Sequence, residues 1–261
     1  MVQLQTNPGS RCVSSRHRAR IPAKHPLNVI LPMEGTLTRA SQAVPAFEDV
    51  IILQEPTSDQ LFFVNFVLLE DRSAHTLCSE DCPQRHCDTE PWPTFVHLLE
   101  VPTLMGTPTQ IVSILRELCA RGKKCAGLPR PLALTITERQ PLDITVSIPL
   151  AAVLLEYPVA YVPANADQTA FLAGVRLDVY DFALSLSGNP DRHDAEGGSG
   201  DACTIFKFSC PSHLAGEDAA LLPARVLERM QSRLGARLNA AGCQCGLVVR
   251  HTTETHDRLS L

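Results

Sequence analysis

The segment 149–187 constrains the fold more than any other part of the chain, because it holds the longest strand-like run. Apolar and polar residues alternate over 175–179, and the apolar alternation then shifts by one residue, so that Tyr180 and Phe182 continue it. A β-bulge accounts for such a shift. Burial on both faces, as in a central strand covered by helices on each side, accounts for it equally well. Both interpretations place this run at the centre of a sheet.

A short apolar helix is expected just before this run. Ser147 can cap it, and Pro149 suits its first turn, where a missing N–H costs nothing. Pro158 should end it, because a residue that precedes proline is pushed toward extended geometry.

The remaining periodicity predicts a single mixed α/β domain over 46–261. Strand-like runs occupy 50–53 and 61–69, which 54–60 can join as a hairpin, and further strands are expected at 94–101, 132–136, 203–210 and 245–251. Helices are expected over 107–122, with Gly122 as its stop, and over 221–241. We expect one mixed sheet of about six or seven strands with helices packed on it. Flexible loops are predicted at 71–93 and 188–202.

The overall composition limits the classes of function. The chain has 261 residues, of which 44% are hydrophobic, enough for one domain with a substantial core. Its net charge of -5 argues against nucleic-acid binding, and no run is long and apolar enough to span a membrane. Ten cysteines without an apolar signal segment predict reduced thiols in a soluble, intracellular protein, most simply a cytoplasmic one.

The N-terminal residues 1–45 are predicted to form a disordered basic tail. Residues 1–33 contain arginine and lysine but no aspartate or glutamate, a composition that a mitochondrial presequence also has. Pro8, Pro22 and Pro26 interrupt the amphipathic helix that such a presequence needs. Mitochondrial import, or nuclear localisation through 16–20, is therefore the alternative to a cytoplasmic location.

A polar, cysteine-rich loop holds the candidate metal ligands. Thiols and imidazoles that could reach one zinc ion lie close together in the sequence: His75, Cys78, Cys82, His86 and Cys87. Their Cys-x3-Cys-x4-Cys spacing is not that of the usual paired zinc knuckles, so a reduced, exposed loop is the favoured interpretation. We expect no cofactor, with zinc as the alternative. His251, Glu254 and His256 also resemble a ligand triplet, but their spacing favours a solvated chain end.

The candidate catalytic residues lie on the central strand. Asp178 and Asp181, near Tyr157 and Tyr161, are the carboxylates that a hydrolase or transferase could use. In a regular strand the two face opposite sides unless a bulge re-aims one of them. Both carboxylates in one cleft would support an enzyme, whereas both on the open surface would contradict it.

Short motifs in the second half carry a resemblance to a known family. Residues 155–161, Leu-Glu-Tyr-Pro-Val-Ala-Tyr, are similar to its Leu-x-Tyr-Pro-Val-x-Tyr, and 208–214 are similar to its Phe-Ser-x-Pro-x-x-Leu. The chain thus resembles a eukaryotic family whose human member is an open reading frame on chromosome 1. No activity is established for that family, so the resemblance implies no functional residues.

The sequence leaves open whether the protein is an enzyme. It contains no nucleophile elbow, phosphate loop, dinucleotide fingerprint or zinc-protease helix. We therefore expect a non-enzymatic interaction or regulatory module that binds a protein partner and neither nucleic acid nor membrane. The alternatives are a hydrolase or transferase with its site at the end of the central strand, and a zinc-stabilised binding module using the 75–87 loop.

Overall fold

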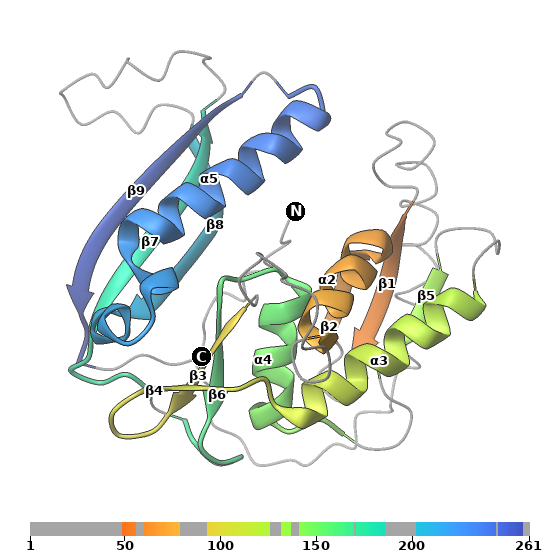
Figure 1. Cartoon of the computed structure of the whole chain (residues 1–261), viewed down its shortest axis with the longest axis horizontal. Coiled ribbons are helices and arrows are strands. Elements are labelled where there is room, and N and C mark those ends of the chain that lie inside the picture. The colour runs from red at the N-terminus through yellow and green to blue at the C-terminus, as the bar shows by residue number, and fades with distance from the viewer. Residues whose placement is uncertain are drawn as a thin grey trace, which may run out of the picture.

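The computed structural model describes residues 49–55, 60–78, 93–125, 132–136, 141–169, 171–185, 202–243 and 245–257. Within these ranges, helices pack on three sheets of three strands each, which confirms the mixed α/β class. The strands do not join into the single sheet that we predicted. Each strand pairs only within its own group of three. In Figure 1, the third sheet and its helix lie to one side of the other two sheets. In the same ranges, no helix is long and apolar enough to cross a membrane.

The first sheet has the order β2-β1-β5 and contains the predicted hairpin. β1 (Val50–Glu55) pairs antiparallel with β2 (Gln60–Asn65) and parallel with β5 (Leu132–Thr135). The second strand is shorter than predicted, since α2 (Phe66–Cys78) begins directly after it. The Asn65 side chain causes this change, because its Oδ1 accepts a hydrogen bond from the Leu68 N–H at 3.1 Å, as a helix N-cap does. The first part of the predicted 71–93 loop is therefore helical.

The second sheet has the order β4-β3-β6. β3 (Thr94–Leu98) pairs antiparallel with β4 (Thr103–Met105) and parallel with β6 (Val159–Pro163). α3 (Thr109–Lys124) buries the predicted apolar stripe of Ile111, Leu115 and Leu118. Gly122 does not stop this helix but lies inside it, where a Cβ would come 2.1 Å from the Phe66 ring. The glycine therefore allows α2 and α3 to approach each other closely.

α4 (Ile144–Leu154) begins earlier than we predicted. Asp143, rather than Ser147, is its N-cap, and the Asp143 carboxylate accepts a hydrogen bond from the Thr145 N–H at 2.9 Å. Pro149 consequently lies inside the helix and not in its first turn. The Asp143 carboxylate accepts the exposed N–H of Thr145 in the first turn, so the helix starts there.

The third sheet has the order β8-β7-β9 and is antiparallel throughout. β7 (Arg176–Ser185) lies between β8 (Ala202–Pro211) and β9 (Gly246–Thr255), as expected for the central run. Both faces of β7 are buried over 177–180, so burial explains the shifted alternation. A register shift does occur, but later: Phe182 pairs with Phe206 and Ala183 with Thr204, which leaves Ile205 as the extra residue.

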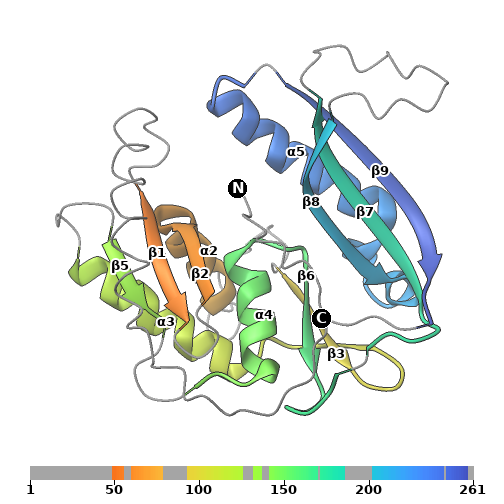
Figure 2. The ribbon, with the colours of Figure 1, turned by 180° about the vertical axis from the view of Figure 1, so that it is seen from behind.

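Helix α5 (Pro223–Ala240) covers one face of the third sheet, as Figures 1 and 2 show from opposite sides. Two short 3-10 helices, η2 (Ser212–Gly216) and η3 (Ala219–Leu221), connect β8 to α5. Val226 and Met230 of α5 are buried in one cluster with Tyr180 and Phe182 of β7. Val96 and Val159 belong to the same cluster, so the second sheet packs next to the third.

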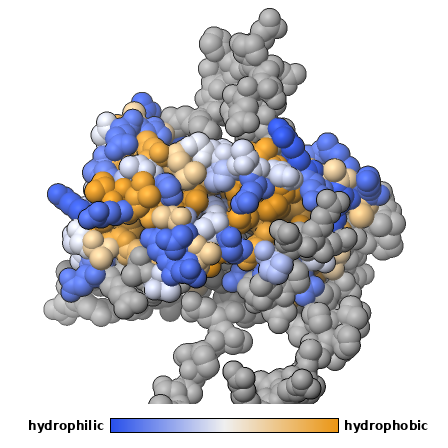
Figure 3. All heavy atoms as spheres, turned by 90° about the horizontal axis from the view of Figure 1, so that it is seen from below, coloured by the Kyte–Doolittle hydropathy of each residue, from blue (hydrophilic) through white to orange (hydrophobic). Residues whose placement is uncertain are grey.

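The outer surface seen in Figure 3 mixes apolar and polar side chains. Large apolar side chains that are exposed in the described part of the chain come from several elements: Val67, Leu68, Leu99, Val101 and Leu222.

Candidate functional site

The structure does not bring the two predicted carboxylates together. Asp178 is only 7% exposed and lies opposite Cys210 and Thr253 in the sheet. Asp181 lies on the other face, where its Oδ1 accepts a hydrogen bond from Thr204 Oγ1 at 3.0 Å. The register shift comes after Asp181, between Phe182 and Ala183, so it does not re-aim either carboxylate. Their separation therefore follows from the two-residue period of a regular strand.

The two tyrosines near these carboxylates have structural contacts. The Tyr161 hydroxyl donates a hydrogen bond to the Ser209 carbonyl oxygen at 3.0 Å, and burial raises its pKa. The Tyr157 ring stacks on Phe206, with the ring centroids 4.6 Å apart, and burial raises its pKa as well. Neither hydroxyl therefore ionises near neutral pH.

Asp178 instead forms a cluster with β9. The His251 Nε2–H donates to Asp178 Oδ1 at 3.1 Å, and the Thr253 hydroxyl donates to the same oxygen at 3.1 Å. The His251 ring also stacks on Tyr180, with centroids 5.0 Å apart. We call Asp178, Tyr180, Cys210, His251 and Thr253 the Asp178 cluster. Two hydrogen bonds to one buried carboxylate oxygen therefore link the outer strand to the central strand.

Two further groups of the Asp178 cluster stay protonated at neutral pH. Burial, helped by the charges of Asp178 and Asp218, raises the pKa of the Cys210 thiol to about 12. Burial and Asp178 also raise the pKa of Tyr180, whose buried hydroxyl has no hydrogen-bond partner among the described residues. A thiolate or phenolate nucleophile is thus not formed here, and the chemistry left to the cluster is that of the Asp178–His251 pair.

Among the described residues, β9 is an edge strand of the third sheet, with no strand paired to its outer side. In the described part of the chain it pairs with β7 alone, and Figures 1 and 2 both show it as the outermost strand. Its ten residues run in unbroken register with β7, and they include neither proline nor lysine. The opposite edge, β8, carries a register shift, Lys207 and Pro211. Bulges, lysine and proline protect sheet edges from further pairing, and β8 has all three. β9 has none of these three, and its charged side chains are Arg250 and Glu254.

The side chains of β9 carry an alternating charge pattern. Arg250, Thr252 and Glu254 lie on one face, because their partners in β7 are Asp181, Val179 and Leu177. The Thr252 hydroxyl donates to Glu254 Oε1 at 2.9 Å and lowers the pKa of that carboxyl, with a smaller effect from His256. Glu254 is consequently charged at neutral pH. This face presents a positive, a hydroxyl and a negative group in order.

The predicted metal ligands are not assembled where the structure describes them. His251 and Glu254 lie on opposite faces of β9, and His256 Nε2 is 3.0 Å from Glu254 Oε2. In the cysteine-rich segment, His75 and Cys78 belong to α2, whereas Cys82, His86 and Cys87 lie outside the described residues. Among the described residues, no three metal-ligating side chains come close enough to share an ion. The zinc hypothesis for the 75–87 loop stays a prediction.

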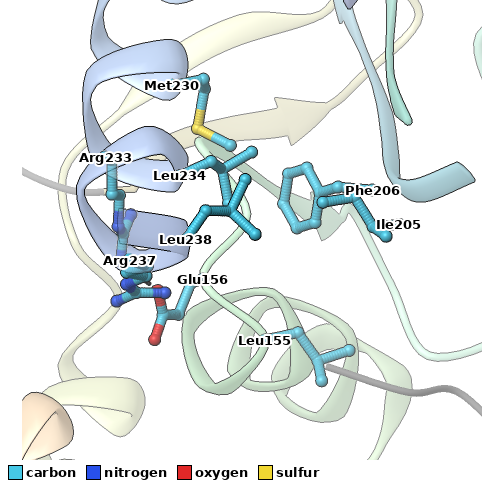
Figure 4. A pocket seen from close by; sticks show the side chains of 9 residues that line it. All are labelled: Leu155, Glu156, Ile205, Phe206, Met230, Arg233, Leu234, Arg237 and Leu238. Atoms are coloured by element: carbon cyan, nitrogen blue, oxygen red, sulfur yellow. Dashed lines mark hydrogen bonds and ion pairs between the residues drawn. The ribbon is translucent and has the colours of Figure 1, made fainter. Parts of the chain in front are cut away.

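A small groove lies between the end of α4, β8 and α5. Its volume is about 160 Å³, and Figure 4 shows Met230, Leu234 and Leu238 facing Phe206 and Ile205 across it. At one side, Glu156 bonds to Arg233, and its Oε2 lies 2.6 Å from Arg237 Nη1. The Glu156 carboxylate therefore lies in the groove, and its ion pairs with Arg233 and Arg237 join the segment after α4 to α5.

The Asp178–His251 contact and the ion pairs of Glu156 were not predicted from the sequence. The Asp178–His251 contact joins residues that are far apart in the chain, and only the pairing of β7 with β9 brings them together. Arg233 and Arg237 lie one helical turn apart on the predicted last helix, and this spacing indicates a shared acidic partner. The sequence does not show that this partner is Glu156.

Comparison of the chain with protein-family models, curated proteins and solved structures gave no match, so its function is inferred from its own residues. The resemblance to the chromosome 1 family stays a prediction.

Proposed function

We propose that the protein is a non-enzymatic interaction module that binds an extended segment of a partner protein along β9. The contrast between the two edges of the third sheet carries this proposal: β9 is regular and open, whereas β8 has a bulge, a lysine and a proline. An extended segment that adds to an open edge gains main-chain hydrogen bonds along its whole length.

The Asp178 cluster supports this role because it fixes β9 before a partner arrives. His251 and Thr253 are both held by the buried Asp178 carboxylate, at 3.1 Å each. Binding to a strand that is already ordered avoids most of the entropy cost of ordering a loop. The cluster thus has a structural task that explains its burial without requiring catalysis.

The charge pattern of β9 specifies the chemistry of the partner segment. In an antiparallel pair, directly opposite residues share a face, and opposite charges across the strands are favourable. A partner strand that matches this face has a basic residue opposite Glu254, a hydroxyl residue opposite Thr252 and an acidic residue opposite Arg250. Read from its own N-terminus, the segment has the pattern basic-x-hydroxyl-x-acidic.

A peptide-display selection on the whole chain tests this proposal. We expect enrichment of extended peptides with the basic-x-hydroxyl-x-acidic pattern. Thr252→Lys places a lysine on the exposed edge and should weaken the binding of these peptides about tenfold. Ala202→Lys is the matched control, because it places the same side chain at the exposed start of β8, and it should leave binding unchanged. Failure to enrich any pattern, or equal losses in both variants, would contradict the proposal.

A hydrolase or transferase is the second candidate function. The Asp178–His251 pair favours it, because a carboxylate that orients an imidazole is the arrangement of a general base, and the His251 side chain is 27% exposed. Turnover of chromogenic esters or phosphoesters that is lost in His251→Asn and kept in His256→Asn would support this alternative. Absence of turnover across such a panel would count against it.

A further inference from the structure

The strand that best complements β9 is β9 itself. We infer that a second copy of this chain pairs its β9 antiparallel with β9 of the first, about a two-fold axis through Thr252. The inference rests on the proposed function, because it names the partner of the same open edge. Residues 250–254 read Arg-His-Thr-Thr-Glu, which is the basic-x-hydroxyl-x-acidic pattern required of a partner segment.

The register follows from the positions of the two charges. With the axis at Thr252, Arg250 of one copy lies opposite Glu254 of the second copy, and the same contact recurs on the other side of the axis. Directly opposite side chains in an antiparallel pair are about 4.5–5.5 Å apart at Cβ, so each pair can interact. Moving the axis by one residue, to His251 or Thr253, separates both pairs. The charges therefore select one register.

The surrounding structure is compatible with this arrangement. Arg250, His251 and Thr252 are exposed, and within the described ranges no other strand flanks the outer side of β9. A two-fold axis perpendicular to the sheet joins the two third sheets into one of six strands, with α5 of both copies on the same face. The interface is isologous, so each copy contributes the same residues and the assembly closes as a dimer.

Charge reversal tests the inference by sedimentation equilibrium of the full chain. Arg250→Glu alone, or Glu254→Arg alone, turns both attractive pairs into repulsive ones and should weaken dimerisation about tenfold or more. The double variant restores both pairs and should associate as the wild type does. A mixture of the two single variants should also form a dimer, because each chain then meets its complement. Recovery in the mixture excludes misfolding as the cause of the loss.

Disulfide trapping tests the register and needs no charge change. Thr252→Cys places the two introduced thiols on the axis, within the Cα separation that a disulfide requires. Thr255→Cys is the control, since its two thiols lie about 20 Å apart along the pair. We expect oxidation to yield a symmetric 252–252 cross-linked peptide in the first variant, and no 255–255 peptide in the second.

A wild-type chain that stays monomeric at high concentration, with no 252–252 cross-link, would overturn the inference. The same holds for a dimer that is unaffected by the charge reversals. Either result leaves the peptide selections to decide whether β9 binds a different protein, so the two proposals fail separately.

Discussion

The His251 imidazole on the outermost strand of the third sheet is hydrogen-bonded to the buried Asp178 carboxylate at the centre of that sheet, with 3.1 Å between Nε2 and Oδ1. The same carboxylate oxygen accepts the Thr253 hydroxyl. An edge strand is usually the least firmly held strand of a sheet. In β9, however, the side chains of His251 and Thr253 are hydrogen-bonded to Asp178 of the central strand. In the described ranges no strand pairs with the outer side of β9, and its side chains are anchored to the central strand, which suits it to strand addition.

Removing this tie should cost stability. Asp178→Ala leaves the His251 and Thr253 donors without their acceptor, so we expect the free energy of unfolding to fall by about 1–3 kcal/mol. Asp181→Ala, on the opposite face of the same strand, removes one hydrogen bond to Thr204 and should cost less than about 1 kcal/mol. Urea denaturation measures both values. Equal losses in the two variants would show that the Asp178 cluster does not anchor β9.

Glu156 combines a favourable ion pair with an unfavourable backbone. Its φ of 65° is in the left-handed region, and its carboxylate binds Arg233 and Arg237. Glu156→Ala loses the ion pairs and keeps the strained backbone, whereas Glu156→Gly loses the ion pairs and relieves the strain. We expect the glycine variant to be more stable than the alanine variant by about 1 kcal/mol in thermal or urea unfolding. A glycine variant less stable than alanine would contradict this account.

Gly122 and Gly235 should respond oppositely to the same substitution. A Cβ at Gly122 would lie 2.1 Å from the Phe66 ring, so Gly122→Ala should destabilise the protein by about 1–3 kcal/mol. A Cβ at Gly235 would meet nothing within 4 Å, so Gly235→Ala should stabilise α5 by about 0.5–1 kcal/mol. Adding Phe66→Leu to Gly122→Ala should recover part of the loss. No recovery would mean that the Phe66 ring is not the obstacle.

The cysteines should differ in reactivity. A hydrogen bond from the Cys245 thiol lowers the pKa of Cys243 and raises that of Cys245, whereas burial raises the pKa of Cys210 to about 12. A lower thiol pKa gives more thiolate at pH 7.5, so iodoacetamide should modify Cys243 before Cys245, and Cys210 only after unfolding. Peptide mass spectrometry gives the order. Cys245→Ala should slow the labelling of Cys243, and an unchanged rate would refute the hydrogen-bond effect.

Much of the fold could be predicted because local patterns determine it. The hairpin of β1 and β2, the apolar stripe of α3 and the central place of β7 all follow from short-range periodicity. The start of α2 was missed because the apolar run continues past Asn65, and only the hydrogen bond from the Leu68 N–H to the Asn65 side chain shows where the strand ends.

The site was harder to predict because it depends on pairing between distant segments. Asp178 was identified as a notable carboxylate, but its partners His251 and Thr253 are 73 and 75 residues away. The sequence pattern of the last strand does not reveal its partner strand. The open edge of β9 likewise becomes visible only once the strand order is known, since the alternation of side chains is the same in a central and an edge strand.

Amide hydrogen exchange along β9 tests the central claim most directly. The full chain is compared with and without a saturating peptide of the pattern basic-x-hydroxyl-x-acidic, at a concentration of protein where it is monomeric. We predict that the peptide slows exchange in the segment 246–255 and leaves 202–211 unchanged, because β9 is the edge that accepts a strand. Protection that appears on 202–211 instead, or on neither strand, would contradict the account.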